Sequence, residues 1–326
     1  MSKSRLATAL LEGLDQGGDG PVAVFRPEPD YDISVLEGRD VTIVHGFRPH
    51  MNAWAEQGMA VADACHEVAL AIVAVPKSKS LARALIAEAM KKAELVFVDG
   101  SKDHGIDSLF KECRKRVGDI ASVTKAHGRL FVMEGSRLFD DWASRGPVQG
   151  PEGFYTQAGV FSETAVDRGS VLLANALPEK LPARIADLGA GWGYLSHQIL
   201  QHQGVRSLDL WEAEQRSLEC AKLNITDPRA VFYWADAPRD LPKRSYDAVV
   251  MNPPFHAGKR ADVALGQGFI AAASQSLVAG GHLWMVANRH LPYEAVLAET
   301  FAKVEELAGD SGFKVLHAHR PKGGRA

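Results

Sequence analysis

The stretch IADLGAGWGYL (residues 185–195) joins a short apolar run to a longer amphipathic one through three glycines. The apolar run at 184–188 predicts a buried strand, and the run at 194–203 predicts a helix. A glycine-rich turn between a strand and a helix is typical of α/β sheets that bind nucleotides, yet a tight turn needs glycine whatever its function. By itself the loop therefore indicates a parallel sheet and leaves its ligand open.

Both halves of the chain repeat this alternation of short apolar runs and longer amphipathic ones. The pattern predicts parallel strands covered by helices, that is, an α/β fold. In the first half, strands are predicted at residues 41–45, 68–75, 95–99 and 129–133, and helices at 80–93 and 105–117. In the second half, further strands are predicted at residues 207–211, 231–234, 246–251, 282–287, 303–307 and 313–319. Helices there are predicted at residues 167–176, 215–224, 264–277 and 293–301.

Length favours two domains, with one large α/β domain as the alternative. A chain of 326 residues is about twice the usual length of a domain. The segment 140–159 is rich in glycine and proline and shows no period, so it is predicted to connect the two. We expect a first domain at 1–145 and a second domain at 154–326. Their similar coarse pattern indicates a duplication.

Charge and cysteine content argue against several classes of protein. The formal net charge is −3, so the global charge gives no sign of nucleic-acid binding. Three widely spaced cysteines and twelve scattered histidines form no metal-binding motif, so we expect no metal. The cysteine pattern fits a reducing compartment, and no apolar run reaches the ~20 residues of a membrane-spanning helix. We therefore expect a soluble cytoplasmic protein.

Three carboxylates follow three successive predicted strands of the second domain. Asp187 lies just before the glycine loop, Glu212 ends the next strand, and Asp236 follows the third. The carboxyl ends of parallel strands line the crevice where open α/β sheets bind ligands. Three acids suit a nucleoside that carries positive charge, such as S-adenosylmethionine, better than they suit a pyrophosphate. The loop also has the form G-x-G-x-G, which departs from the G-x-G-x-x-G spacing of dinucleotide-binding proteins.

The segment MNPPFHAGK (residues 251–259) ends the fourth predicted strand of this domain with two prolines. Prolines cannot donate to a sheet, so the chain leaves the strand there, and Asn252 faces the same crevice. The side-chain oxygen of Asn252 and the carbonyl of Pro253 are predicted to accept both hydrogens of an amine on a planar ring. Pro254 stiffens the corner, and Phe255 offers a face for the ring. The corner therefore predicts a planar amine that attacks an electrophilic methyl group, with acceptors preorganised for it.

These motifs resemble those of class I S-adenosylmethionine-dependent methyltransferases that modify planar nitrogens. The finer resemblance is to the bacterial ribosomal RNA guanine-N2 methyltransferases (RsmC-like), and it covers about residues 154–320. Its further motifs are GVFS at 159–162, NPPFH at 252–256, VANRHLPY at 286–293 and GFKV at 312–315. In the first half, VPKSK at 75–79 and HGR at 127–129 look like that family's amino-terminal domain, while VTIVHGFR at 41–48 carries no glycine fingerprint.

The resemblance implies two Rossmann-like domains. The second, catalytic domain is expected to hold a seven-stranded, mostly parallel sheet with a reversed final hairpin. The first is expected to be a degenerate copy without the cofactor loop, for recognition of the RNA target. The implied cofactor is S-adenosylmethionine, and the implied partner is ribosomal RNA or a ribosomal subunit, with the chain expected to be a monomer. The cofactor would be held by Asp187, Gly189, Ala190, Gly191, Gly193, Glu212, Asp236, Ala237 and Asn252. The target guanine would be held by Asn252, Pro253, Pro254 and Phe255. Trp192 is a bulky departure within the glycine loop.

Four cations are candidates for contact with RNA: Arg48, Lys77, Lys79 and Arg289. Phosphate contacts of this kind provide affinity, and the pocket selects the base. The run KECRKR at 111–116 is more typical of a solvated helix face.

The Asn-Pro-Pro corner does not by itself distinguish guanine N2 from two other planar amines, adenine N6 in a nucleic acid and glutamine N5 in a protein. Phe255, in place of the more usual tyrosine, and the flanking motifs favour guanine. A non-catalytic RNA-binding or ribosome assembly factor that keeps the same fold is an alternative of another class. The presence of Asp187, Glu212 and Asn252 argues against it.

Overall fold

The chain forms two compact units in the computed structural model, Met1–Gly146 and Pro147–Ala326. The structure describes residues 4–15, 20–254 and 260–322. The boundary between the two units lies inside the glycine- and proline-rich segment 140–159.

The N-terminal unit contains one sheet and four α-helices among its described residues. Its strands are β1 (Val22–Phe25), β2 (Val41–Val44), β3 (Ala60–Ala62), β4 (Val68–Ala74), β5 (Ala93–Ser101), β6 (Ser122–Lys125) and β7 (Gly128–Glu134). Its helices are α1 (Arg5–Leu11), α2 (Arg48–Glu56), α3 (Lys79–Lys92) and α4 (Ile106–Val117), with short 3-10 turns η1 (Ser34–Leu36), η2 (Lys102–His104) and η3 (Asp140–Trp142).

The C-terminal unit begins with a short hairpin and continues into a second large sheet. Its strands are β8 (Val148–Gln149), β9 (Tyr155–Thr156), β10 (Arg184–Leu188), β11 (Ser207–Glu212), β12 (Ala230–Trp234), β13 (Tyr246–Met251), β14 (Leu277–Asn288), β15 (Phe301–Gly309) and β16 (Phe313–Pro321). Its helices are α5 (Arg168–Ala176), α6 (Tyr194–Ile199), α7 (Gln215–Asn224), α8 (Ala237–Asp240), α9 (Arg260–Ser276) and α10 (Tyr293–Thr300).

The two large sheets have the same topology. Their seven strands follow the orders β3-β2-β1-β4-β5-β7-β6 and β12-β11-β10-β13-β14-β16-β15. Neighbouring strands are parallel except around β7 and β16, which pair antiparallel with both of their neighbours. The predicted α/β fold class is therefore confirmed: each unit carries a mostly parallel sheet that ends in a reversed hairpin.

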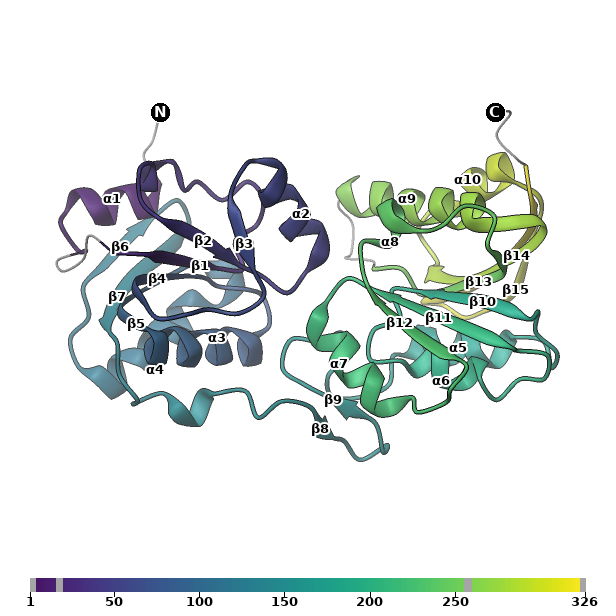
Figure 1. Cartoon of the computed structure of the whole chain (residues 1–326), viewed down its shortest axis with the longest axis horizontal. Helices are drawn as coiled ribbons and strands as arrows, with labels where there is room; N and C mark the ends of the chain where they lie inside the picture. The colour runs from purple at the N-terminus through teal and green to yellow at the C-terminus, as the bar shows by residue number, and fades with distance from the viewer. Residues whose placement is uncertain (1–3, 16–19, 255–259, 323–326) are drawn as a thin grey trace. The chain divides into compact units, whose positions relative to one another are not determined.

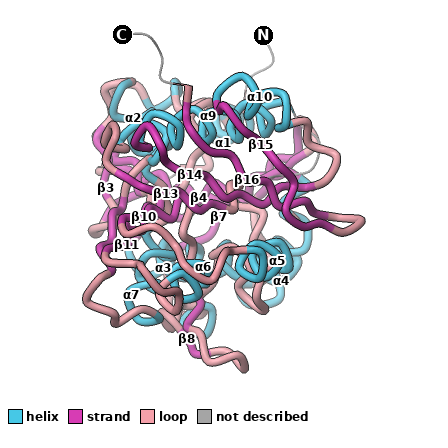
Figure 2. The backbone as a smooth tube through the Cα atoms, turned by 90° about the vertical axis from the view of Figure 1, so that its right-hand side faces the viewer, coloured by secondary structure: helices cyan, strands magenta, loops and turns pink. Residues whose placement is uncertain are grey.

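Each sheet lies between two layers of helices. In the C-terminal unit, α9 and α10 cover one face and α5, α6 and α7 cover the other (Figures 1 and 2). Alternate residues of β10 enter these two cores, because Ile185 packs with α5 and α6 while Leu188 packs with α9. In the N-terminal unit, α3 and α4 cover one face and α1 and α2 the other. Burial on both faces explains why the central strands are nearly continuous apolar runs.

The strands and helices expected from sequence are all present, and β10, α7 and β13 match to the residue. The helix expected at 194–203 ends at Ile199, because tight turns follow it, with bonds from the amides of Gln201 and His202 to carbonyls three residues back. The prediction misses β1, β3, β6, β8 and β9, and the helices α1, α2 and α8. Strand β1 shows the reason: four residues buried on both faces display neither alternation nor a helical period.

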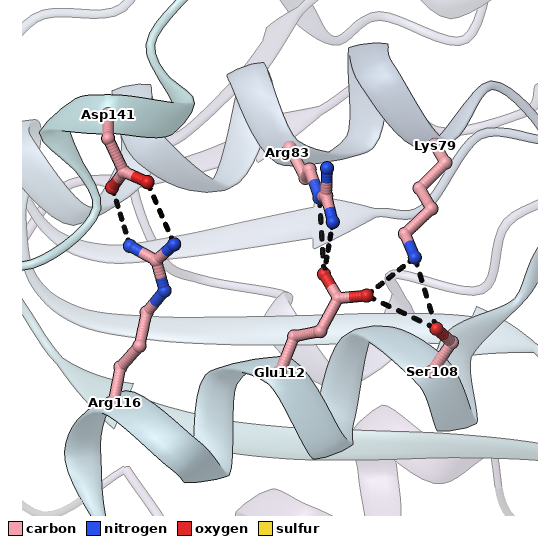
Figure 3. Close-up of polar contacts among 6 residues, drawn as sticks. All are labelled: Lys79, Arg83, Ser108, Glu112, Arg116 and Asp141. Atoms are coloured by element: carbon pink, nitrogen blue, oxygen red, sulfur yellow. Dashed lines mark hydrogen bonds and ion pairs between the residues drawn. The ribbon is translucent and has the colours of Figure 1, made fainter.

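An ion-paired group joins α3 to α4 in the N-terminal unit (Figure 3). The Glu112 carboxylate accepts from Lys79 at 2.5 Å and from Arg83 at 2.7 Å, and the Lys79 amine also donates to the Ser108 hydroxyl at 3.2 Å. These pairs are partly exposed, so each contributes on the order of 1 kcal/mol or less. Their main consequence is that Lys79 and Arg83 point at a carboxylate of their own unit.

The η3 turn packs beside this group and closes the N-terminal unit. Arg116 forms two hydrogen bonds with the Asp141 carboxylate, at 2.5 and 2.8 Å (Figure 3). The guanidinium carbons of Arg83 and Arg116 lie 5.2 and 4.6 Å from the centroid of the Trp142 ring, and Phe139 is fully buried beneath. Cations over an aromatic face attract it. The indole of Trp142 thus ties the last turn of the unit to both α3 and α4.

Replacement of Trp142 by alanine is expected to destabilise the N-terminal unit by about 1–3 kcal/mol, because a large half-buried ring and two cation–π contacts are lost together. Calorimetric thermal unfolding of the full chain measures the effect. Trp142→Phe should recover most of the loss, and Leu138→Ala, at a side chain that is 57% exposed, serves as the control. Equal unfolding temperatures for Trp142→Ala and Leu138→Ala would contradict the assignment.

Candidate active site

The glycine loop turns the chain from β10 into α6. Gly189, Gly191 and Gly193 all have positive φ, at 69°, 58° and 95°. At Gly193 space is also short, since an added Cβ would lie 2.9 Å from the Ile225 side chain. The amides of Gly189 and Ala190 both donate to the carbonyl of Trp211, which fixes the start of the loop against β11. Glycine is therefore required here by backbone geometry and by the close approach of α7.

Asp187 lies under the loop and is fully buried. One carboxylate oxygen accepts from the Ser196 hydroxyl at 2.6 Å, and the other has no hydrogen-bond partner among the described residues. Burial raises the pKa of Asp187 to about 7, although the Ser196 hydrogen bond opposes the shift. A buried carboxylate with one unpaired oxygen is stabilised when a cation binds nearby.

Glu212 is the last residue of β11, the strand next to β10, and it binds the glycine loop by a hydrogen bond. Its two oxygens accept from the amides of Gly191 and Glu214, each at 2.7 Å. Burial raises the pKa of Glu212 to about 7, and the charge of Glu214 adds to this, while the two amides oppose it. Each oxygen keeps a further lone pair, so the carboxylate can also accept from ligand hydroxyls.

Asp236 follows β12 and is the N-cap residue of α8, which starts at the buried Ala237. Burial, followed by the neighbouring Asp240 charge, raises the pKa of Asp236. The structure thus places the three predicted acids, Asp187, Glu212 and Asp236, at the carboxyl ends of three adjacent strands. These three carboxylates can bind a cation and accept hydrogen bonds from ribose hydroxyls.

Asn252 directly follows β13, next to the glycine loop. Its amide nitrogen donates to Asp167 Oδ2 at 2.9 Å and to the Ser170 hydroxyl at 2.8 Å. A carboxylate accepts hydrogen bonds and does not donate them, so the atom that faces Asp167 is the nitrogen. The amide oxygen therefore points away from Asp167, and it accepts no hydrogen bond from a described residue. An acceptor of fixed direction is left for a ligand.

Of the other predicted residues in the segment 251–259, only the two prolines lie among the described residues. Pro253 is buried and Pro254 is exposed. Phe255 lies outside the described residues, as does His256, so the predicted stacking face at Phe255 has no structural account here.

A pocket opens beside Asn252 and the glycine loop. The residues that line it are Phe161, Ser162, Asp167, Ser170, Gly189, Ala190, Gly191, Trp192, Tyr194, Leu195 and Asn252. One wall is formed by residues 154–166, which we call the strap, together with the start of α5. The strap precedes the sheet in sequence and still contributes to its ligand crevice.

Trp192 fastens the strap to the glycine loop. Its indole nitrogen donates to the carbonyl of Phe161 at 3.0 Å, and its ring packs with Val160 and Cys220 in a small buried cluster. Asn224, the last residue of α7, adds a second link because its amide donates to the carbonyls of Trp192 and Tyr155. The bulky residue in the loop is thus an anchor for the strap.

Sequence reasoning gave no role in this site to five residues: Phe161, Asp167, Ser170, Trp192 and Asn224. Asp167 carries one usable signal, since Asp-x-x-Ser at the start of an amphipathic run marks a helix N-cap, and the Asp167 carboxylate does accept from the Ser170 amide at 2.7 Å. Nothing in the sequence pattern indicates that the same carboxylate also binds Asn252.

The N-terminal unit lacks this chemistry at the matching places. The last residue of β1 pairs with Val44 of β2, and the last residue of β10 likewise pairs with Trp211 of β11. The same two residues pair with β4 and β13 on the other side, so β4 matches β13. By this register, the places of Asp187, Gly189, Glu212 and Asn252 are taken by Val24, Arg26, His45 and Ala74. Burial, followed by the charge of Arg26, lowers the pKa of His45 to about 2, so the imidazole there is neutral. At these four places the N-terminal unit offers no carboxylate for a cationic cofactor.

The four cations predicted to contact RNA lie in different settings. Lys77 is exposed after β4, and Arg48 is half-buried at the first turn of α2. Lys79 is paired with Glu112 (Figure 3), and the Arg289 guanidinium donates to Glu306 at 2.8 Å and to carbonyls of the β15–β16 turn. Lys79 and Arg289 therefore have structural partners within their own units.

The described part of the chain contains neither a candidate metal site nor a helix that could span a membrane. No group of three or more His, Cys, Asp or Glu side chains among these residues is placed to hold a metal ion. No helix there is long and apolar enough to cross a membrane.

Comparison with known proteins follows the same division of the chain. The family model "Methyltransferase small domain" matches residues 152–317, a range that includes the whole strap and every residue that lines the pocket. A ribosomal RNA small subunit methyltransferase C from Shewanella pealeana is 32% identical over 258 residues, or 75% of each chain. Its namesake from Acinetobacter baylyi is 28% identical over 263 residues, or 76% of this chain and 78% of the relative.

A solved structure supports the two-unit fold. It is the T. thermophilus 16S rRNA N2 G1207 methyltransferase (RsmC) in complex with AdoMet and guanosine, with a TM-score of 0.82, 24% identity, and coverage of 98% of this chain and 92% of that one. The matching model and the 32% identical relative establish the family, and we conclude that this chain belongs to the ribosomal RNA small subunit methyltransferase C family of Methyltransferase small domain proteins.

Proposed function

We propose that this chain is an S-adenosylmethionine-dependent methyltransferase that modifies the exocyclic N2 amine of a guanine in ribosomal RNA. The observation that carries the proposal is the Asn252 amide, which Asp167 and Ser170 orient so that its oxygen remains as an acceptor beside the glycine loop. The relatives are named as ribosomal RNA methyltransferases. The solved structure of the same fold holds AdoMet and guanosine.

The acids at the strand ends fit the proposed cofactor. S-adenosylmethionine supplies a methyl group made electrophilic by its sulfonium. Asp187, whose free oxygen is buried without a partner, suits a nearby cation. Glu212 suits the ribose hydroxyls, and Asp236 suits the adenine end of the same crevice. Gly189, Ala190, Gly191 and Gly193 shape the loop around it, and Ala237 begins α8 beside Asp236.

The Asn252 oxygen and the Pro253 carbonyl would each accept one hydrogen of the target amine. The lone pair of an amine on a purine ring is delocalised, and two acceptors on its hydrogens favour the pyramidal form that attacks carbon. In the transfer the nitrogen–methyl bond forms as the methyl–sulfur bond breaks, and the nitrogen then loses a proton to water. Because the acceptors are fixed before reaction, little reorganisation is needed.

We also propose a division of labour between the units. The C-terminal unit carries the chemistry, and the N-terminal unit serves in target recognition, because its matching positions lack the acids and Asn252. Lys77, which is exposed after β4, is the better candidate for phosphate contact. A base must be single-stranded or flipped out of its helix to reach the pocket.

The affinity for S-adenosylmethionine is expected to fall as the pH drops from 8 to 6. Asp187 and Glu212 both have a pKa raised to about 7, so they are mostly ionised at pH 8 and mostly protonated at pH 6. A protonated carboxyl group does not balance the positive charge of the cofactor. The loss is about tenfold if one acid must be ionised and about a hundredfold if both must be. Titration calorimetry across this pH range measures the affinity. In Glu212→Gln only Asp187 still titrates, so the pH dependence should be no more than tenfold. An affinity that does not change with pH would contradict the prediction.

Wild-type protein is expected to form N2-methylguanosine in unmethylated small-subunit ribosomal RNA, and Asn252→Ala is expected to lower kcat about 100- to 1000-fold, since one fixed acceptor is lost. Affinity for S-adenosylmethionine should stay nearly unchanged. Nucleoside mass spectrometry identifies the product, and calorimetry gives the cofactor affinity. A methylated adenine, or no nucleoside product, would refute guanine N2 as the target. A large loss of cofactor affinity would instead assign Asn252 to cofactor binding.

Asp167→Ala is expected to lower kcat about ten- to a hundredfold, because the Asn252 amide becomes free to turn. It also removes the cap of α5 and about 1 kcal/mol of stability. Ser78→Ala is the matched control: Ser78 caps α3 through the Leu81 amide at 3.2 Å, far from the pocket in sequence, so stability should fall with kcat unchanged. Asp167→Asn keeps an acceptor oxygen and should retain most of the rate. If Asp167→Ala and Ser78→Ala lower kcat alike, Asp167 acts through stability alone.

A further inference from the structure

Phe161 is an aromatic side chain that the fold leaves uncovered at the active-site pocket. It is 59% exposed, and it lines the same pocket as Asn252 and the glycine loop. A single exposed apolar residue is common on protein surfaces. An exposed aromatic ring in a pocket that also contains a fixed hydrogen-bond acceptor is a different case, because the two together match the face and the edge of a planar ring.

The backbone around Phe161 prevents the ring from turning inward. Its carbonyl accepts from the Trp192 indole, and the next residue, Ser162, has a positive φ of 53°. The preceding residue, Val160, is 5% exposed and packs in the cluster beneath the strap. With Val160 inward and both neighbours of the Phe161 peptide fixed, the Phe161 ring is held outward.

Two further hydrogen bonds close the strap into a rigid turn around this ring. The Glu163 carboxylate accepts from the Gly159 amide at 2.8 Å, and the Glu163 carbonyl accepts from the Thr156 hydroxyl at 2.7 Å. The exposed position of Phe161 is therefore built by the chain on both sides of it.

We propose that Phe161 contacts the substrate and supplies an aromatic face on which the base of the target nucleoside stacks. This inference rests on the proposed function and names a substrate-binding residue for it. The Asn252 oxygen takes the amine at the edge of the base, and the Phe161 ring takes its face. Glu212 and Asp236, the acids suited to the ribose and adenine of the cofactor, do not line this pocket. The ring is thus on the side of the crevice that holds the Asn252 acceptor.

The test compares Phe161→Ala with Phe161→Tyr and with Leu223→Ala. Leu223 is a matched control, since it is a large apolar residue of the same unit, 49% exposed on α7 and outside the pocket. Three quantities are measured: KM for unmethylated small-subunit ribosomal RNA, affinity for guanosine in the presence of S-adenosylhomocysteine, and affinity for S-adenosylmethionine.

Phe161→Ala is expected to weaken guanosine binding and to raise KM for RNA about tenfold, the range found when a stacking partner is removed. Phe161→Tyr keeps the ring and should behave as wild type, as should Leu223→Ala. Affinity for S-adenosylmethionine should be the same in all four proteins, which also shows that Phe161→Ala is folded.

Guanosine affinity that is equal in Phe161→Ala and wild type would overturn the inference. Loss of affinity for S-adenosylmethionine with no loss for S-adenosylhomocysteine would also overturn it, because the ring would then face the sulfonium. A wild-type protein that neither binds guanosine nor methylates RNA refutes the proposed function itself, and the role of Phe161 with it. Either result that overturns only the role of Phe161 is obtained with an active wild-type protein. Failure of the proposed function shows as an inactive wild-type protein, so the two failures are distinguishable.

Discussion

The Asp167 carboxylate makes two hydrogen bonds on which the geometry of the pocket depends. It accepts from the Ser170 amide and so begins α5, and it accepts from the Asn252 amide and so sets the direction of that group. Because a carboxylate only accepts, a single residue decides which atom of Asn252 remains for a ligand. A common helix cap thereby becomes part of a substrate site, and the start of α5 and the end of β13 are held in one arrangement.

The strap depends on a comparable link at the other side of the loop. Glycine at three positions lets the loop turn, while Trp192 within it is buried and binds the Phe161 carbonyl. A small residue at 192 would leave the turn possible and remove the anchor. The loop therefore has two tasks, which explains why a bulky residue lies between glycines: the glycines give the backbone its path, and the indole fixes the segment that faces it.

The sequence predicts much of this and misses a definable part. Strand and helix periods give the fold class, and they also predict that Asp187, Glu212 and Asp236 lie at strand ends, because each stands at the end of a recognisable strand. Side-chain contacts across long separations leave no period. Asp167 and Asn252 are 85 residues apart, and Trp192 and Phe161 are 31 apart. The same limit applies to Lys79. In sequence it looks like a cation available for RNA, but it is paired with Glu112, 33 residues away.

The repeated fold gives these contacts their meaning. Two sheets of identical topology bury similar apolar strands, so burial alone does not explain why one unit carries acids at its strand ends. Where Glu212 is kept as a buried carboxylate with a raised pKa, the matching His45 is neutral, and where Asn252 offers an acceptor, Ala74 offers none. Burial of a carboxylate opposes folding unless a bound ligand compensates for the free energy of its desolvation. The C-terminal unit keeps that unfavourable group and the N-terminal unit has none at the matching place, which is the difference expected if the C-terminal unit alone binds a cationic cofactor.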